Sequence, residues 1–114
     1  MLEHFFIQLS TEPLSISFIQ SITLIDELYN FTPSAFKNGE LFNAAGENNG
    51  SCKILAFGAL HQLSAPQTLH LYGDYYRQVM ATPKAHDHQN IRNFMRSGWA
   101  GVVFDNQPLT AKMG

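Results

Sequence analysis

The stretch NAAGENNGSCK, residues 43–53, joins a part of the chain with an irregular pattern to a part with a helical pattern. It combines three asparagines and two glycines with the only cysteine of the chain, Cys52. Asparagine and glycine tolerate positive φ angles, so the backbone can turn sharply here and direct several amide N–H groups to one point. Ser51 is suited to the N-cap position, which predicts a helix from Cys52 to about Leu63. This turn and the helix after it are therefore the first candidates for a functional site.

Apolar residues with helical spacing recur on both sides of this turn. Ser64 and Asp87 are suited to cap two later helices, and Gly98 is suited to end the second of them. Between those two helices, Thr82-Pro83 disfavours continuation of a helix. The predicted helices cover approximately residues 2–9, 17–29, 52–63, 65–81 and 88–97.

Short β-elements are predicted in two places. Asn38-Gly39 lies between Phe36 and Leu41-Phe42, a pattern typical of a hairpin with a two-residue turn. Residues 101–104 are a further short strand candidate. The predicted fold class is therefore mostly α: a single small helical domain, residues 1–114, with four to five helices and a minor β-hairpin or short strand.

Composition and charge exclude several classes of protein. Of the 114 residues, 45% are hydrophobic and only 14% are charged, which is below the usual proportion of charged residues. The net charge is −2 and no basic stripe is present, so we expect no nucleic-acid partner. No stretch approaches the ~20 apolar residues of a membrane span, so we expect no membrane partner. A single cysteine cannot form an internal disulfide, which is typical of a reducing compartment.

Cys52 is a candidate nucleophile, because a thiol at a helix N-terminus can have a lowered pKa. It would need a base, but His61 is nine residues further on, half a turn out of phase and about 13 Å along the helix. His86 or His88 would therefore have to supply the base from another part of the chain. Against this hypothesis, Cys52 shares a helix face with alanine and leucine residues, which is typical of a thiol buried in the core.

The sequence His86-Asp87-His88 has two interpretations. Two histidines around an aspartate could contribute to a metal site, but the chain has no metal-binding spacing such as HExxH. Alternatively, Asp87 caps the following helix, where its negative charge is favourable next to the helix dipole. We favour the cap, and we expect neither a metal nor another cofactor. If the protein is an enzyme, His88 is a catalytic candidate in this segment.

Amide side chains are concentrated in the helix predicted after Asp87 and in the turn before Cys52. Asparagine is a poor helix former, so Asn90 and Asn93 are expected to hydrogen-bond either the loop of residues 43–49 or a ligand, and we favour the loop. Tyr75 lies about 100° from the apolar stripe of its helix and could reach the same groove. The residues predicted to line a binding groove are Asn43, Asn48, Asn49, Ser51, Lys53, Asn90 and Asn93.

Several of these segments, taken in order, resemble one known family. They are Phe31-Thr32-Pro33, Asn38-Gly39, NNGSCK at 48–53, GDYYR at 73–77, DHQNIRNFM at 87–95 and Gly98-Trp99. Together they are similar to the HopJ type III effector family over nearly the whole chain, from about Phe18 to Lys112. The resemblance implies a small bacterial protein, and the family name implies delivery into a host cell by a type III secretion apparatus. It implies no particular reaction, catalytic residue or ligand.

Two functions remain open at this point. We favour a non-enzymatic binding or interaction module, whose polar groove contacts a protein or a small ligand. The alternative is a small enzyme, a hydrolase or transferase, that uses Cys52 or the segment His86–His88, with Tyr75 orienting the substrate.

The location of the protein is also left with two alternatives. Type III export signals are typically unstructured and rich in serine, whereas the N-terminal spacing here predicts a helix that begins near Leu2. We therefore expect the protein in the bacterial cytoplasm. The alternative is secretion into a host cell, where a host protein would be the partner.

Overall fold

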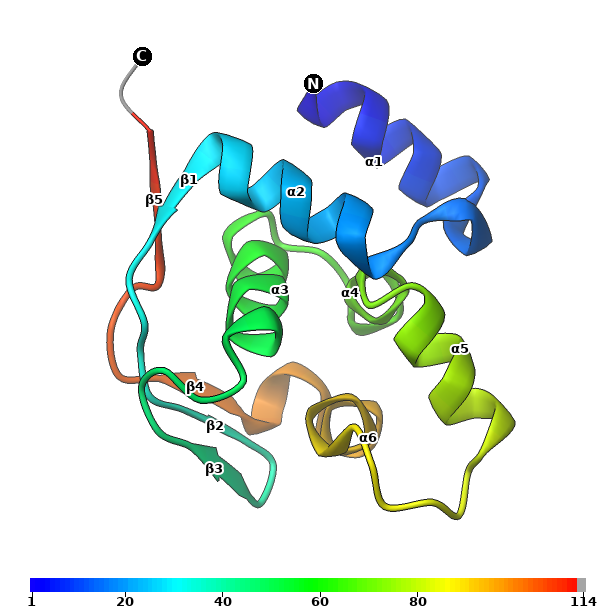
Figure 1. Ribbon diagram of the computed structural model, residues 1–114, viewed down its shortest axis with the longest axis vertical. Coiled ribbons are helices and arrows are strands. Elements are labelled where there is room, and N and C mark those ends of the chain that lie inside the picture. The colour runs from blue at the N-terminus through cyan, green and yellow to red at the C-terminus, as the bar shows by residue number, and fades with distance from the viewer. Residues whose placement is uncertain (113–114) are drawn as a thin grey trace.

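The fold is mixed α/β, so the prediction of a mostly α fold with a minor β-element is wrong. The computed structural model describes residues 1–112, and within them it contains six α-helices and two small antiparallel sheets (Figure 1). The helices are α1 (Leu2–Thr11), α2 (Phe18–Leu28), α3 (Asn49–Leu60), α4 (Ala65–Leu71), α5 (Asp74–Ala81) and α6 (Gln89–Ser97), with short 3-10 turns at Pro13–Ser15 and Gly98–Gly101.

Five three-residue strands form the two sheets. They are β1 (Tyr29–Phe31), β2 (Phe36–Asn38), β3 (Leu41–Asn43), β4 (Val102–Phe104) and β5 (Leu109–Ala111). One sheet pairs β1 with β5, and the other has the order β3-β2-β4. The strands that were not predicted from the sequence are chiefly β1 and β5, because strands this short have no alternation of apolar and polar residues long enough to be recognised.

The β2–β3 hairpin lies where Asn38-Gly39 predicted one. Asn38 pairs with Leu41, so the two-residue turn is Gly39–Glu40. Gly39 has a φ of 63°, which is the conformation that a hairpin turn with glycine in its first position requires. On the other side of β2, Phe36 pairs with Phe104 of β4, which completes the three-stranded sheet. Strands β2 and β3 of this sheet contact α6.

Helix α3 is the centre of the core. Its residues Cys52 and 54–58 are buried, so it is covered on nearly all sides, as expected for a helix without a polar face. It contacts α2, α4 and β5, and Figure 1 shows it enclosed between α2 and the sheet that contains β4. Full burial of a side chain such as Phe57 contributes roughly 1.5–3 kcal/mol to the free energy of unfolding.

The single helix predicted over residues 65–81 is divided into α4 and α5 at Gly73. This glycine has a φ of 59°, and a Cβ atom there would lie 2.5 Å from the backbone nitrogen of Phe18. The break is therefore imposed by the close approach of α2, which no local pattern around Gly73 reveals. It places Tyr72 and Tyr75 on either side of the bend, where both rings pack against Phe18.

The two predicted N-caps next to the candidate site are also wrong. Helix α3 begins at Asn49, with Asn48 at the N-cap, so Ser51 lies inside the first turn. Helix α6 begins at Gln89, with His88 at the N-cap, and Asp87 lies one residue before it. Both N-cap residues are left-handed, with φ values of 52° and 51°, and neither side chain caps its helix.

Candidate functional site

A cleft of about 540 Å3 lies between the starts of α3 and α6. Its polar side consists of side chains from those two starts: Asn48, Ser51, His88, Gln89 and Asn90. Its apolar side comes from α2, β3, the α4–α5 bend and α6, and consists of Phe18, Leu41, Tyr72, Tyr75 and Ile91. Gly50 completes the lining, which contains no aspartate, glutamate, lysine or arginine.

The structure brings together about half of the residues that the sequence singled out. Asn48, Ser51, Asn90, Tyr75 and His88 all line the cleft. The others lie elsewhere, at Asn43, Asn49, Cys52, Lys53 and Asn93. Three further residues line the cleft but were not predicted as site residues from the sequence: Phe18, Tyr72 and Gln89.

The side chains of two of the predicted groove residues lie outside the cleft. Asn49 is exposed and is not part of the lining. The Lys53 ammonium forms an ion pair with Asp26 of α2 at 2.8 Å and lies 5.0 Å from the centre of the Phe31 ring. Lys53 therefore joins α3 to α2 and β1, and it does not contribute charge to the cleft.

Behind the cleft, three buried asparagines and the exposed Asn48 form a hydrogen-bonded network. Asn43 and Asn90 exchange two amide hydrogen bonds of 3.1 and 3.0 Å between their side chains. Asn48 donates to Asn43 Oδ1 at 2.7 Å, and Asn38 donates to the Asn90 carbonyl at 2.7 Å. The network ties β2, β3 and the start of α3 to α6, which is the loop-holding role favoured from the sequence. Asn38 was missed because the sequence predicted it in the turn of the hairpin, whereas it lies in β2 and pairs with Leu41.

Asn93 serves its own helix. Its Nδ2 donates to the Gln89 carbonyl at 2.9 Å, and its Oδ1 accepts a bond of 3.0 Å from Arg96. Both ends of the amide are therefore engaged within α6, one turn away from the cleft.

Cys52 is buried in the core, with 1% of its surface exposed. Its thiol is 3.8 Å from the Ser34 carbonyl, to which it donates a weak hydrogen bond. Burial raises the pKa of the Cys52 thiol, and the bond to Ser34 lowers it by less. An inaccessible thiol with a raised pKa has the opposite properties to those of a nucleophilic cysteine.

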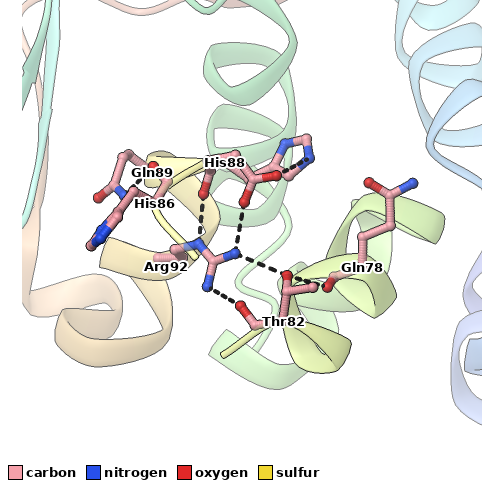
Figure 2. Close-up of polar contacts among 7 residues, drawn as sticks. Gln78, Thr82, His86, His88, Gln89 and Arg92 are labelled. Carbon is pink, nitrogen blue, oxygen red and sulfur yellow. Dashed lines mark hydrogen bonds and ion pairs between the residues drawn. The ribbon is translucent and has the colours of Figure 1, made fainter. Parts of the chain in front are cut away.

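Arg92 holds the connection between α5 and α6 in place (Figure 2). Its guanidinium is nearly buried and binds both ends of this connection. Nε donates to the Asp87 carbonyl at 2.6 Å and Nη2 to the Asp87 carboxylate at 2.7 Å, while Nη1 donates to the Thr82 carbonyl at 2.8 Å. These bonds lower the pKa of the Asp87 carboxyl group. The clamp also fixes the left-handed His88, so Asp87 acts on the start of α6 through Arg92 and not as its cap.

Aromatic rings form one wall of the cleft. The Phe18 ring lies 6.5 Å from that of Tyr72 and 5.0 Å from that of Tyr75, and the Tyr75 ring lies 5.1 Å from the His88 imidazole. His86 is exposed and lies outside this wall. Tyr72 was missed because it belongs to the apolar stripe that predicted core packing.

Among residues 1–112, no three His, Cys, Asp or Glu side chains are grouped as metal ligands would be. Over the same residues, no helix has the length and apolar character needed to cross a membrane.

Fold and site together define a small mixed α/β protein with an uncharged cleft between two helix starts. The chain belongs to the HopJ family: the family model described as HopJ type III effector protein matches residues 2–109. The chain is also similar to a solved structure described as the crystal structure of unknown function protein VPA0580, with a TM-score of 0.96 and 48% identity over 98% of this chain and 94% of the other. Among curated proteins, none matches the chain.

Proposed function

We propose that this HopJ-family protein is a non-enzymatic binding module that holds a small ligand in the cleft between α3 and α6. The observation that carries the proposal is the convergence of Asn48, Ser51, Tyr75, His88 and Asn90 on one cleft of about 540 Å3. This volume is within the usual range for small-molecule sites, and a mixed lining of aromatic and polar groups is typical of them.

The surroundings of the cleft support a preformed site. The asparagine network fixes the start of α3 against β2 and β3, and the Arg92 clamp fixes the start of α6. A site held by several buried hydrogen bonds loses little conformational entropy when a ligand binds.

A fragment titration followed by 1H–15N NMR tests the proposal. The amide signals of the cleft residues are expected to shift together and to saturate with at least one class of fragment. Tyr75→Ala removes part of the aromatic wall and is expected to weaken that binding. Met80→Ala is the matched control, because Met80 is exposed on the same helix but lies outside the cleft. If no fragment shifts the cleft signals as a group, the binding function is overturned.

A second candidate function is an enzyme that uses His88 as a general base. The observation that favours it is the position of the His88 imidazole in the cleft, next to the Tyr75 ring. Cys52 is not part of this version, because its thiol is buried. A ligand identified by the titration is to be incubated with the protein and with His88→Gln. Turnover that the variant loses would favour the enzyme, and a ligand recovered unchanged would favour the binding module.

The family description supports action in a host cell after type III secretion, which makes a host molecule the partner of the cleft. Residues 1–30 fused to a reporter provide the test, in bacteria with and without an intact type III apparatus. Export that depends on the apparatus is the expected result. Retention in both strains would favour a role in the bacterial cytoplasm.

A further inference from the structure

We propose that the cleft recognises an oxyanion, the carboxylate or phosphate group of a small ligand with a planar apolar part. The N–H groups at the starts of α3 and α6 and the Tyr72 hydroxyl bind the oxyanion, while Phe18 and Tyr75 pack against the apolar part. This inference rests on the proposed binding function and specifies the chemical class of its ligand.

The first observation is that two helix starts facing one cleft have free N–H groups. Neither Asn48 nor His88 caps its helix with a side chain. Among residues 1–112, the backbone N–H groups of residues 49–51 and 89–91 have no hydrogen-bond acceptor. Such N–H groups point out of the helix start, and each start carries the equivalent of about half a positive charge. Two starts at one cleft therefore provide roughly one positive charge for an anion.

The second observation is the Tyr72 hydroxyl, which is independent of the helix starts. Tyr72 is 2% exposed, it lines the cleft, and its phenol oxygen has no hydrogen-bond partner among residues 1–112. Burial raises the pKa of the Tyr72 phenol, so the group keeps its proton and is a donor at neutral pH. The Ser51 hydroxyl, in the first turn of α3, is close enough to lower the pKa of the Tyr72 phenol slightly, but the two groups do not reach hydrogen-bond geometry. A buried donor without an acceptor destabilises the free protein, and an oxyanion would supply the acceptor.

No charge of the lining opposes an anion. The cleft contains no carboxylate, and the nearby Asp87 carboxylate is bound by Arg92 at 2.7 Å. The Asp74 carboxylate, at the start of α5, accepts the Phe18 backbone N–H at 3.1 Å. These two carboxylates, and that of Glu47, which accepts the Ala44 N–H at 2.9 Å, are therefore engaged in the fold.

The aromatic wall of the cleft indicates the chemical character of the uncharged part of the ligand. The Phe18 and Tyr75 rings meet edge to face at 5.0 Å, and Tyr75 is 37% exposed. A planar ring can pack against this surface while its charged substituent reaches the helix starts. An aromatic carboxylate or phosphate ester fits these requirements.

The experiment compares three probes of similar shape in a buffer without phosphate: benzoate, phenyl phosphate and the uncharged benzamide. We expect one or both anions to shift the amide signals of residues 49–51 and 89–91 saturably, with an affinity at least about tenfold above that of benzamide. The stronger of the two anions identifies carboxylate or phosphate as the preferred group. Benzamide binding as tightly as both anions would overturn the oxyanion inference and leave the binding function standing. No saturation by either anion at about 10 mM would overturn the inference as well, while the fragment titration separately decides the binding function.

Tyr72→Phe provides the second measurement. Because the hydroxyl has no partner in the free protein, the variant is expected to have an equal or higher Tm, while its affinity for the preferred anion falls about tenfold. Tyr29→Phe is the matched control: its hydroxyl is paired with His61 Nε2 at 2.6 Å and lies outside the cleft. The control is expected to lower Tm and to leave the anion affinity unchanged. An unchanged affinity in Tyr72→Phe would overturn the role of the hydroxyl.

Discussion

Helices α2 and α4 begin in a different way from helices α3 and α6. The Ser17 side chain caps α2 by accepting the Gln20 N–H, and Ser64 and Gln67 form a reciprocal capping box at α4. Helices α3 and α6 follow the left-handed residues Asn48 and His88, whose side chains do not cap them. The left-handed conformation costs roughly 1–2 kcal/mol at His88 and less at Asn48, since asparagine tolerates positive φ, and a missing cap costs about 1 kcal/mol. The less stable pair is the pair that faces the cleft, which is the pattern expected where stability is given up for binding.

Arg92→Ala is expected to have the largest effect on this comparison, because it releases the start of α6. The change leaves the Thr82 and Asp87 carbonyls without their donor and removes the ion pair between the buried Arg92 guanidinium and the exposed Asp87 carboxylate. We expect the free energy of unfolding to fall by about 3 kcal/mol in urea denaturation, because two charge-assisted hydrogen bonds to backbone carbonyls are lost. The control is Arg96→Ala, since Arg96 is exposed and, within residues 1–112, donates only to Asn93 Oδ1, and its cost is expected to be about 0.5 kcal/mol or less. Equal costs for both variants would contradict the clamp.

Asn43→Ala releases the start of α3 and is expected to have the next largest effect. It removes the acceptor of both Asn48 and Asn90, so the cost is about 2 kcal/mol. In a double-mutant cycle, Asn43→Ala and Asn90→Ala are expected to couple by about 1 kcal/mol, because the two amides bind each other. Additive costs in urea denaturation would show that the pair does not act as a unit.

Ser64→Ala tests the capped pair and is expected to cost about 1 kcal/mol. The capping box satisfies N–H groups that α3 and α6 leave free, so this loss is purely one of stability. The cleft amide signals in the 1H–15N spectrum are expected to keep their positions. Movement of those signals would mean that the two kinds of helix start are not independent.

The smallest effect is expected when one negative charge is added at the start of α6, which has no side-chain cap, or at the start of α4, which has one. Gln89→Glu places a carboxylate in the first turn of α6, and Gln67→Glu places one in the first turn of α4, where glutamate also suits the capping box. Near a helix N-terminus, each charge is expected to contribute about 0.5 kcal/mol to stability. Only Gln89→Glu is expected to weaken binding of the anionic probes, because only Gln89 lines the cleft. If both variants bind the anionic probes equally well, the start of α6 does not take part in binding the anion.

How much could be predicted from the sequence depended on where the deciding contacts lie. The start of α4 was predictable because Ser64, Pro66 and Gln67 determine it within one turn. The start of α6 was not, because Asp87 has the sequence of a cap but is bound by Arg92, five residues further on. The division at Gly73 depends on the backbone of Phe18, and the pairing of β1 with β5 joins residues about 80 positions apart.

The candidate site was predictable to a similar extent. The sequence pointed to three lining residues, Asn48, Tyr75 and His88, because each lies near a helix start and outside the apolar stripe that packs in the core. Tyr72 was not found, because its spacing is that of a core residue and only the tertiary structure reveals a hydroxyl without a partner. Phe18 was treated as an ordinary helix residue, since its contact with Tyr75 depends on the bend at Gly73.

The pairing of β1 with β5 has a consequence for the synthesis of the protein. Tyr29 is synthesised about 80 residues before its strand partner Ala111. The first sheet therefore cannot close until β5 has been made, and Leu109, which is buried in the finished core, arrives with that strand. Long-range pairings of this kind slow folding, so we expect the helices around α3 to assemble first and β5 to complete the fold.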